Sequence, residues 1–249
     1  MPRTSDLALP RIIIDGVDKT FILRHTHSFK ESFIAKLQKK KTTTSFSALS
    51  DIGFTVQEGE SVALLGYNGS GKSTLLKLIS GVMRPDSGRI LTRGRVAGLI
   101  EVGAGFHPDL SGRENVYLNA AILGMNKDEI DRRFNDIVEF SEIGEFIDTE
   151  VKHYSSGMFV RLAFSVAIHT ELDILLVDEV LAVGDAPFRE KCKKKIQELT
   201  DQGKTMLVVS HDVDMVTQVC KRGIVLRDGK VCFDGAVNDA VASMQGNGA

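Results

Sequence analysis

A glycine-rich loop constrains this chain more than any other feature. It follows the pattern glycine, four residues, glycine, lysine, serine, with the residues Gly66, Tyr67, Asn68, Gly69, Ser70, Gly71, Lys72 and Ser73. Glycines let backbone amides close around phosphate oxygens, which larger side chains would obstruct. The loop follows an apolar strand expected at 61–65 and opens a helix, whose positive end faces the same anion. This context predicts a phosphate-binding site rather than an accidental turn.

Within that loop, two side chains have distinct expected roles. Lys72 supplies a cation to the outer phosphates, and the Ser73 hydroxyl ligates magnesium. We expect the phosphate contacts to extend to Thr74, the next residue of the helix.

Two further expected strands end in polar residues. Asp178 and Glu179 follow the apolar segment 174–177, and His211 follows the segment 206–209. Ligands of parallel sheets bind beyond the carboxyl ends of the strands. We therefore expect Asp178 to hold magnesium, Glu179 to polarise an attacking water and His211 to contact a γ-phosphate. Without the glycine-rich loop, the acids could be solvated loop residues and the histidine a structural one.

Short buried strands that alternate with helices predict an α/β fold whose parallel sheet is covered on both faces. The segment from about 100 to 149 has helical patterns. Residues 11–23 resemble a strand pair, and residues 46–56 a further strand.

Composition excludes several classes of protein. The 249 residues include 31 Lys and Arg against 33 Asp and Glu, and this balance argues against a chain that coats nucleic acid. No apolar run approaches the roughly 18 to 20 residues that a membrane-spanning helix needs. The first ten residues lack the layout of a secretory signal, and the three cysteines lack zinc-like spacing, so we expect a reducing cytoplasm.

A third motif lies ahead of the acidic strand. Tyr154, Ser155, Ser156, Gly157 and Met158 resemble the signature motif of ABC transporter ATPases, Leu-Ser-Gly-Gly-Gln. The motif departs from the family at three positions but retains Ser155 and Gly157, its phosphate-facing positions. Asp185 resembles the D-loop aspartate of the family, and His211 its switch histidine. The resemblance runs from about residue 12 to about residue 233.

This resemblance implies one ABC ATPase domain over residues 1–249, with a P-loop NTPase core. The core has a mainly parallel sheet, an antiparallel β subdomain and a helical subdomain at about 100–160. In the family, the signature of one subunit closes over nucleotide held by the other. The resemblance thus implies a head-to-tail homodimer that sandwiches two ATP molecules with Mg2+, and Glu179 as the general base or water-orienting group in hydrolysis.

The segment 99–108 lacks the glutamine that many relatives carry there, and Glu101 is the nearest polar substitute. This segment through 116, together with 178–185, resembles the ATPases of bacterial exporters of lipid-linked polysaccharides (the O-antigen, teichoic-acid and galactan type). That likeness implies two transmembrane permease subunits and a peripheral place on the cytoplasmic face of the inner (plasma) membrane. Another ABC exporter or importer, or a soluble ABC protein, is the alternative.

Three points stay open. Phe21 fits the aromatic position expected to stack on adenine, and Phe46 is its rival. The basic insert at 24–41 could form a helix at the membrane surface beside a lipid diphosphate, with Phe29, Phe33 and Leu37 as an apolar stripe, or could be a solvated loop. Sixteen residues follow Phe233, so we expect no C-terminal carbohydrate-binding domain.

Overall fold

The computed structural model describes residues 9–24, 43–99, 103, 105–178, 184–210 and 212–245. Four sequence-predicted features lie outside these residues: Glu101, Glu179, His211, and the basic insert beyond Arg24.

A six-stranded sheet forms the centre of the fold, in the order β5-β6-β7-β3-β8-β9. Its first five strands are parallel: β5 (Val96–Gly98), β6 (Ile174–Val177), β7 (Thr205–Val208), β3 (Ser61–Leu65) and β8 (Arg222–Arg227). The last strand, β9 (Lys230–Ala236), pairs antiparallel with β8. The mainly parallel sheet is the predicted one, and its carboxyl ends bring together the residues that follow β3, β6 and β7.

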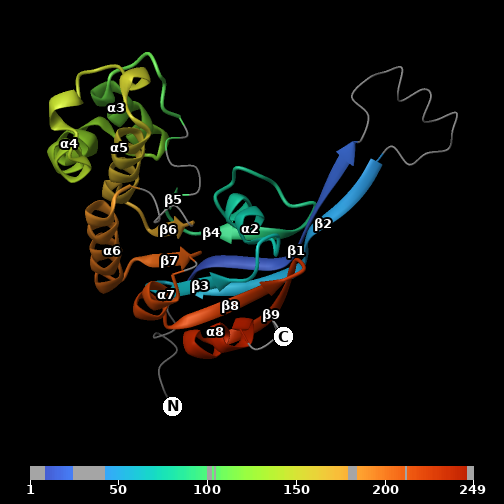
Figure 1. Cartoon of the computed structure of the whole chain (residues 1–249). Helices are drawn as coiled ribbons and strands as arrows, with labels where there is room; N and C mark the ends of the chain where they lie inside the picture. Colours follow the sequence, from blue (N-terminus) through green and yellow to red (C-terminus); the bar gives the residue numbers. More distant parts are fainter. Residues whose placement is uncertain are drawn as a thin grey trace, which may run out of the picture.

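A second, three-stranded sheet has the order β2-β1-β4 and is antiparallel throughout. Its strands are β1 (Pro10–Arg24), β2 (Thr43–Gln57) and β4 (Ser87–Thr92). Figure 1 shows the far ends of β1 and β2 extending away from the rest of the chain.

The expectation of a strand pair within residues 11–23 was wrong. These residues form the single strand β1, which pairs with β2 along its length. The pairing register shifts between Ile14 and Val17, where Gly16 has a φ of 58°. The strand β1 therefore continues through an irregularity and does not turn back. The apolar residues on both sides of that irregularity pair with the long strand β2.

Successive residues of the parallel strands point to opposite faces of the sheet, and both faces are buried. On one face, Leu64 and Leu176 pack with the antiparallel sheet and with helix α2 (Lys72–Ile79). On the other, Leu65 and Leu175 pack against α6 (Ala186–Asp201), α7 (Val213–Val219) and α8 (Val237–Gln245). Since both faces are covered, these strands are apolar throughout rather than alternating.

A group of helices forms the end of the molecule opposite the β1–β2 extension (Figure 1). It comprises α3 (Gly112–Ile122), α4 (Lys127–Ser141), α5 (Ser156–His169) and the short 3-10 helices η1 (Gly144–Phe146) and η2 (Val151–His153). Reciprocal capping boxes begin α3, at Ser111 and Glu114, and α4, at Asn126 and Glu129. The described helices include none with the length and apolar character of a membrane span.

Candidate functional site

The glycine-rich loop joins β3 to α2 and packs tightly against both sheets. A Cβ at Gly66 would collide with the carbonyl oxygen of Leu226 in the central sheet. At Gly71, where φ is 106°, a Cβ would lie 2.6 Å from Leu49 Cδ2 and 2.7 Å from the Ala48 carbonyl oxygen of β2. Glycine at these two positions therefore allows the loop to curl closely over the ends of the strands.

The polar groups of the loop fit an anion. The Lys72 ammonium folds back and donates to the carbonyl oxygens of Gly66, at 2.8 Å, and Tyr67, at 3.1 Å. Ser70 Oγ is buried in the same loop and has no hydrogen-bond partner within the described part of the chain. A cradle that a Cβ would fill, a buried cation and an unpaired hydroxyl together suit the phosphates of a nucleotide.

A cavity of about 280 Å³ opens beside this loop. Two phenylalanines line it together with loop and α2 residues: Phe21, Phe46, Ala48, Asn68, Gly69, Gly71, Lys72, Ser73 and Thr74. Phe21 and Phe46 lie directly opposite each other on β1 and β2, and they are 36% and 50% exposed. Because facing residues of a strand pair share one face, both rings flank the cavity. Both sequence candidates for the aromatic platform thus lie at the site.

Asp178 comes directly after β6. In the sheet only β7 separates β6 from β3, and all three strands are parallel. The carboxyl end of β6 therefore points to the same edge as the glycine-rich loop. Glu179 follows Asp178 in the chain but lies outside the described residues, as do Glu101 and His211.

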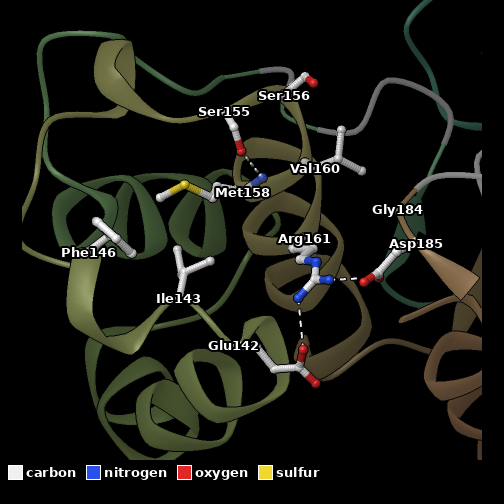
Figure 2. Close-up of a pocket in the computed structure, with 11 residues that line it drawn as sticks. Glu142, Ile143, Phe146, Ser155, Ser156, Met158, Val160, Arg161, Gly184 and Asp185 are labelled. Atoms are coloured by element: carbon white, nitrogen blue, oxygen red, sulfur yellow. Dashed lines mark hydrogen bonds and ion pairs between the residues drawn. The ribbon is translucent and has the colours of Figure 1, made fainter. Parts of the chain in front are cut away.

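Ser155, Gly157 and Asp185 line a different cavity, of about 520 Å³, between α5, the end of α4 and the start of α6 (Figure 2). Ser155 is the N-cap of α5, and its Oγ accepts a hydrogen bond from the Met158 amide at 3.2 Å. Asp185 is the N-cap of α6 and accepts from the Phe188 amide at 3.3 Å. Partial burial acts to raise the pKa of Asp185, but the Phe188 amide and the Arg161 guanidinium together hold it below its ordinary value.

These two cavities share no lining residue. A single copy of the chain therefore does not bring Ser155 and Gly157 into the cavity of Lys72, although both sets were predicted to contact phosphate.

Sequence reasoning missed the contact between two residues of the second cavity, Arg161 and Glu142. Arg161, three residues after the motif, binds both Glu142 and Asp185. The sequence shows that Arg161 lies close to the motif, but it contains no pattern that predicts an ion pair with Glu142. Glu142 follows α4 in a left-handed conformation.

Comparisons with known proteins decide the family. The family model described as "ABC transporter" matches residues 49–182, more than half of the chain. The chain belongs to the ABC transporter family. It is an ABC ATPase domain.

Several relatives and one solved structure extend this likeness. "ABC transporter protein AbcA" of Aeromonas salmonicida is 48% identical over 226 residues, 91% of this chain and 73% of that protein. "O-antigen export system ATP-binding protein RfbB" of Klebsiella pneumoniae is 50% identical over 186 residues, 75% of this chain and 76% of the relative. "Teichoic acids export ATP-binding protein TagH" of Lactococcus lactis is 46% identical over 191 residues, 77% of this chain but 41% of the relative.

The solved structure, "Structure of ATP binding subunit of ABC transporter", has a TM-score of 0.75 at 22% identity, and the match covers 96% of this chain and 95% of that one. It supports the fold that the sequence predicted.

The loop glycines yield a matched pair of variants. We expect Gly71→Ala to weaken ATP binding at least about tenfold more than Gly69→Ala. Both glycines have positive φ, 106° and 82°, but a Cβ at Gly69 meets nothing within 4 Å, so only Gly71→Ala adds steric collision to strain. Titration with a fluorescent ATP analogue measures the difference, and thermal denaturation verifies that both variants fold. Equal affinities would show that the fit of the loop against β2 does not control nucleotide binding.

Proposed function

We propose that this chain is the ATP-hydrolysing subunit of an ABC transporter that exports a lipid-linked polysaccharide across the cytoplasmic membrane. The proposed ATPase activity is supported by the phosphate cradle, in which Gly66 and Gly71 fit against the strands and Lys72 is buried. The export part is supported by the relatives named for O-antigen and teichoic-acid export. We propose a single ATPase domain over 1–249, with its helical subdomain at about 100–160.

Within the nucleotide site, each residue has a proposed role. The loop from Gly66 to Thr74 surrounds the phosphates, and Phe21 stacks on the adenine ring. Ser73 and Asp178 would hold Mg2+, since a hydroxyl and a carboxylate oxygen are donors that this ion prefers. When bound, Mg2+ neutralises charge that develops on the transferred phosphoryl group.

Three residues outside the described part of the chain complete the proposed site. Glu179 orients and deprotonates the attacking water, and His211 contacts the γ-phosphate. Glu101 takes the place of the glutamine that many relatives have. Little covalent chemistry is required of the protein, because positioning and charge stabilisation carry most of phosphoryl transfer.

The second cavity supports a dimer. Ser155 and Gly157 lie at the start of α5, a suitable place for an anion, yet they line a different cavity from Lys72. In the proposed head-to-tail homodimer, Ser155, Gly157 and Asp185 of one copy complete the nucleotide site of the other. Two copies of a transmembrane permease would hold this dimer at the cytoplasmic face of the inner membrane. The net charge of −2 favours no nucleic-acid partner.

Two variants separate hydrolysis from binding. Glu179→Gln should abolish turnover and retain ATP binding, because the amide keeps the shape of the side chain but cannot accept the proton, and an ATP-bound dimer should accumulate. Lys72→Ala should weaken ATP binding itself, because it removes the cation of the loop. Steady-state hydrolysis, ATP titration and light scattering measure these effects.

Glu190→Gln and Lys194→Ala are matched controls, since both residues are exposed on α6. Both should behave like the wild type. Wild-type turnover by Glu179→Gln would remove Glu179 from the mechanism.

Export itself is tested in cells. Loss of the protein should cause a lipid-linked glycan to accumulate on the cytoplasmic side, and the wild-type gene, but not Glu179→Gln, should restore surface glycan. Absence of any accumulated glycan would contradict the proposed substrate class.

The same assay tests the basic insert, whose lysines we propose attract the lipid diphosphate. Changing Lys36, Lys39, Lys40 and Lys41 to Gln should lower export more than basal ATP hydrolysis. The control changes four exposed lysines elsewhere to Gln, with the same loss of charge: Lys127, Lys194, Lys221 and Lys230. Equal export by the two quadruple variants would leave the insert as a solvated loop.

A further inference from the structure

Arg161 joins three helices at the wall of the larger cavity. It lies on α5, and its side chain is only 20% exposed. One guanidinium nitrogen, Nη1, lies 2.8 Å from Glu142 Oε2 at the end of α4, and the other, Nη2, lies 2.6 Å from Asp185 Oδ1 at the start of α6. Figure 2 shows the side chain between these two carboxylates. The guanidinium also lies over the ring of Phe188, 5.0 Å from its centre.

The carboxylate of Glu142 is itself held in place. Glu142 ends α4 in the left-handed region, with a φ of 58°, which is uncommon for a residue other than glycine. Its second oxygen accepts from Lys191 on α6 at 3.0 Å, and Lys191 also donates to the Phe140 carbonyl oxygen at 3.0 Å. Backbone conformations of this kind persist where the surrounding structure determines them. Glu142 therefore offers Arg161 a fixed anchor on α4.

The other partner of Arg161 is Asp185, which follows Glu179, the proposed general base, by six residues in the chain. Arg161 lies on the same helix as Ser155 and Gly157, six residues after Ser155. The guanidinium thus connects α5, which begins at the signature residues, to Asp185 at the start of α6.

We propose that Arg161 is a positioning residue for ATP hydrolysis, which holds Asp185 at the start of α6 in register with the start of α5, where Ser155 and Gly157 lie. This inference rests on the proposed function, in which Glu179 and Ser155 serve the reaction. Arg161 lines the cavity of Ser155 and not that of Lys72, so it acts on the reacting groups only through Asp185. Its loss should lower the rate of the chemical step and leave ATP binding by the loop unchanged.

The chain offers a matched control in Arg113. This residue of α3 also forms a two-nitrogen ion pair, with Asp148 at 2.7 and 3.2 Å, and also lies over an aromatic ring, that of Phe134, at 4.7 Å. Its side chain is 45% exposed, and it lines neither cavity. Arg113→Gln therefore removes the same kinds of contact away from the proposed site.

The experiment compares kcat, KM for ATP and thermal stability in the purified full chain for Arg161→Gln, Arg161→Lys and Arg113→Gln. For Arg161→Gln we expect kcat to fall about tenfold or more and KM to change less than about twofold, the pattern of a lost interaction that matters only in the transition state. Arg113→Gln should keep the wild-type kcat.

Arg161→Lys separates positioning from folding. A lysine can pair with Glu142 and preserve the packing of α5 on α4, but a single ammonium lacks the two separate nitrogens that reach both carboxylates. Its thermal stability should therefore stay near that of the wild type while kcat falls as in Arg161→Gln. If Arg161→Gln does not fold, Arg161→Lys alone decides the question.

A wild-type kcat for Arg161→Lys, or equal kcat values for Arg161→Gln and Arg113→Gln, would overturn the positioning role. The Glu179→Gln variant distinguishes a failure of the proposed Arg161 role from a failure of the proposed nucleotide site. If that variant stops turnover and Arg161→Lys does not slow it, only the role of Arg161 is wrong. If Glu179→Gln hydrolyses ATP like the wild type, the proposed site is wrong.

Discussion

The close approach of the glycine-rich loop to two sheets is the contact on which the rest of the structure depends. Gly66 lies against the Leu226 carbonyl of the central sheet, and Gly71 lies against Ala48 and Leu49 of the antiparallel sheet. No residue with a Cβ fits either place without displacing backbone. The loop therefore sets where α2 begins, and α2 in turn fills the core between the two sheets through Leu75 and Leu76. The phosphate cradle and that core therefore depend on the same contacts.

The parallel sheet explains which of the candidate site residues one copy of the chain brings together. Its carboxyl ends bring the glycine-rich loop and Asp178 to one edge, which suits phosphate and a divalent cation. The signature residues lie instead on the helical part, at the head of α5, and line their own cavity. Two half-sites with complementary anion-binding chemistry on one chain favour a site completed between copies, as we propose.

Short sequence patterns predicted the loop, the strands and the motif whose positions depend on neighbouring residues in the chain. The glycine loop, the apolar strands β3, β6 and β7, and the motif at Ser155 each depend on neighbours in the chain, and the structure has them at or within a residue of the expected positions. The family resemblance extended this to the whole fold. Glu101, Glu179 and His211 were read from the same kind of pattern, and the described structure does not include them.

Long-range pairings could not be predicted. Whether β1 turned back or continued depended on the length of β2, and the position of Phe46 opposite Phe21 depended on their register. The bridge from Arg161 to Glu142 and Asp185 spans 19 and 24 residues, and it requires helices α4, α5 and α6 to meet. Such contacts are properties of the packed chain and leave no periodic signal in the sequence.

Mixing two inactive variants tests most directly whether the nucleotide site is shared between copies. Lys72→Ala disables the loop, and Ser155→Asp adds a negative charge at the signature while aspartate still caps α5. In a mixed dimer, one of the two sites combines an intact loop with an intact signature. Equimolar mixing should therefore restore up to about one quarter of wild-type ATP turnover, since half of the dimers are mixed and each has one intact site. A mixture no more active than its two components would contradict a site shared between two copies.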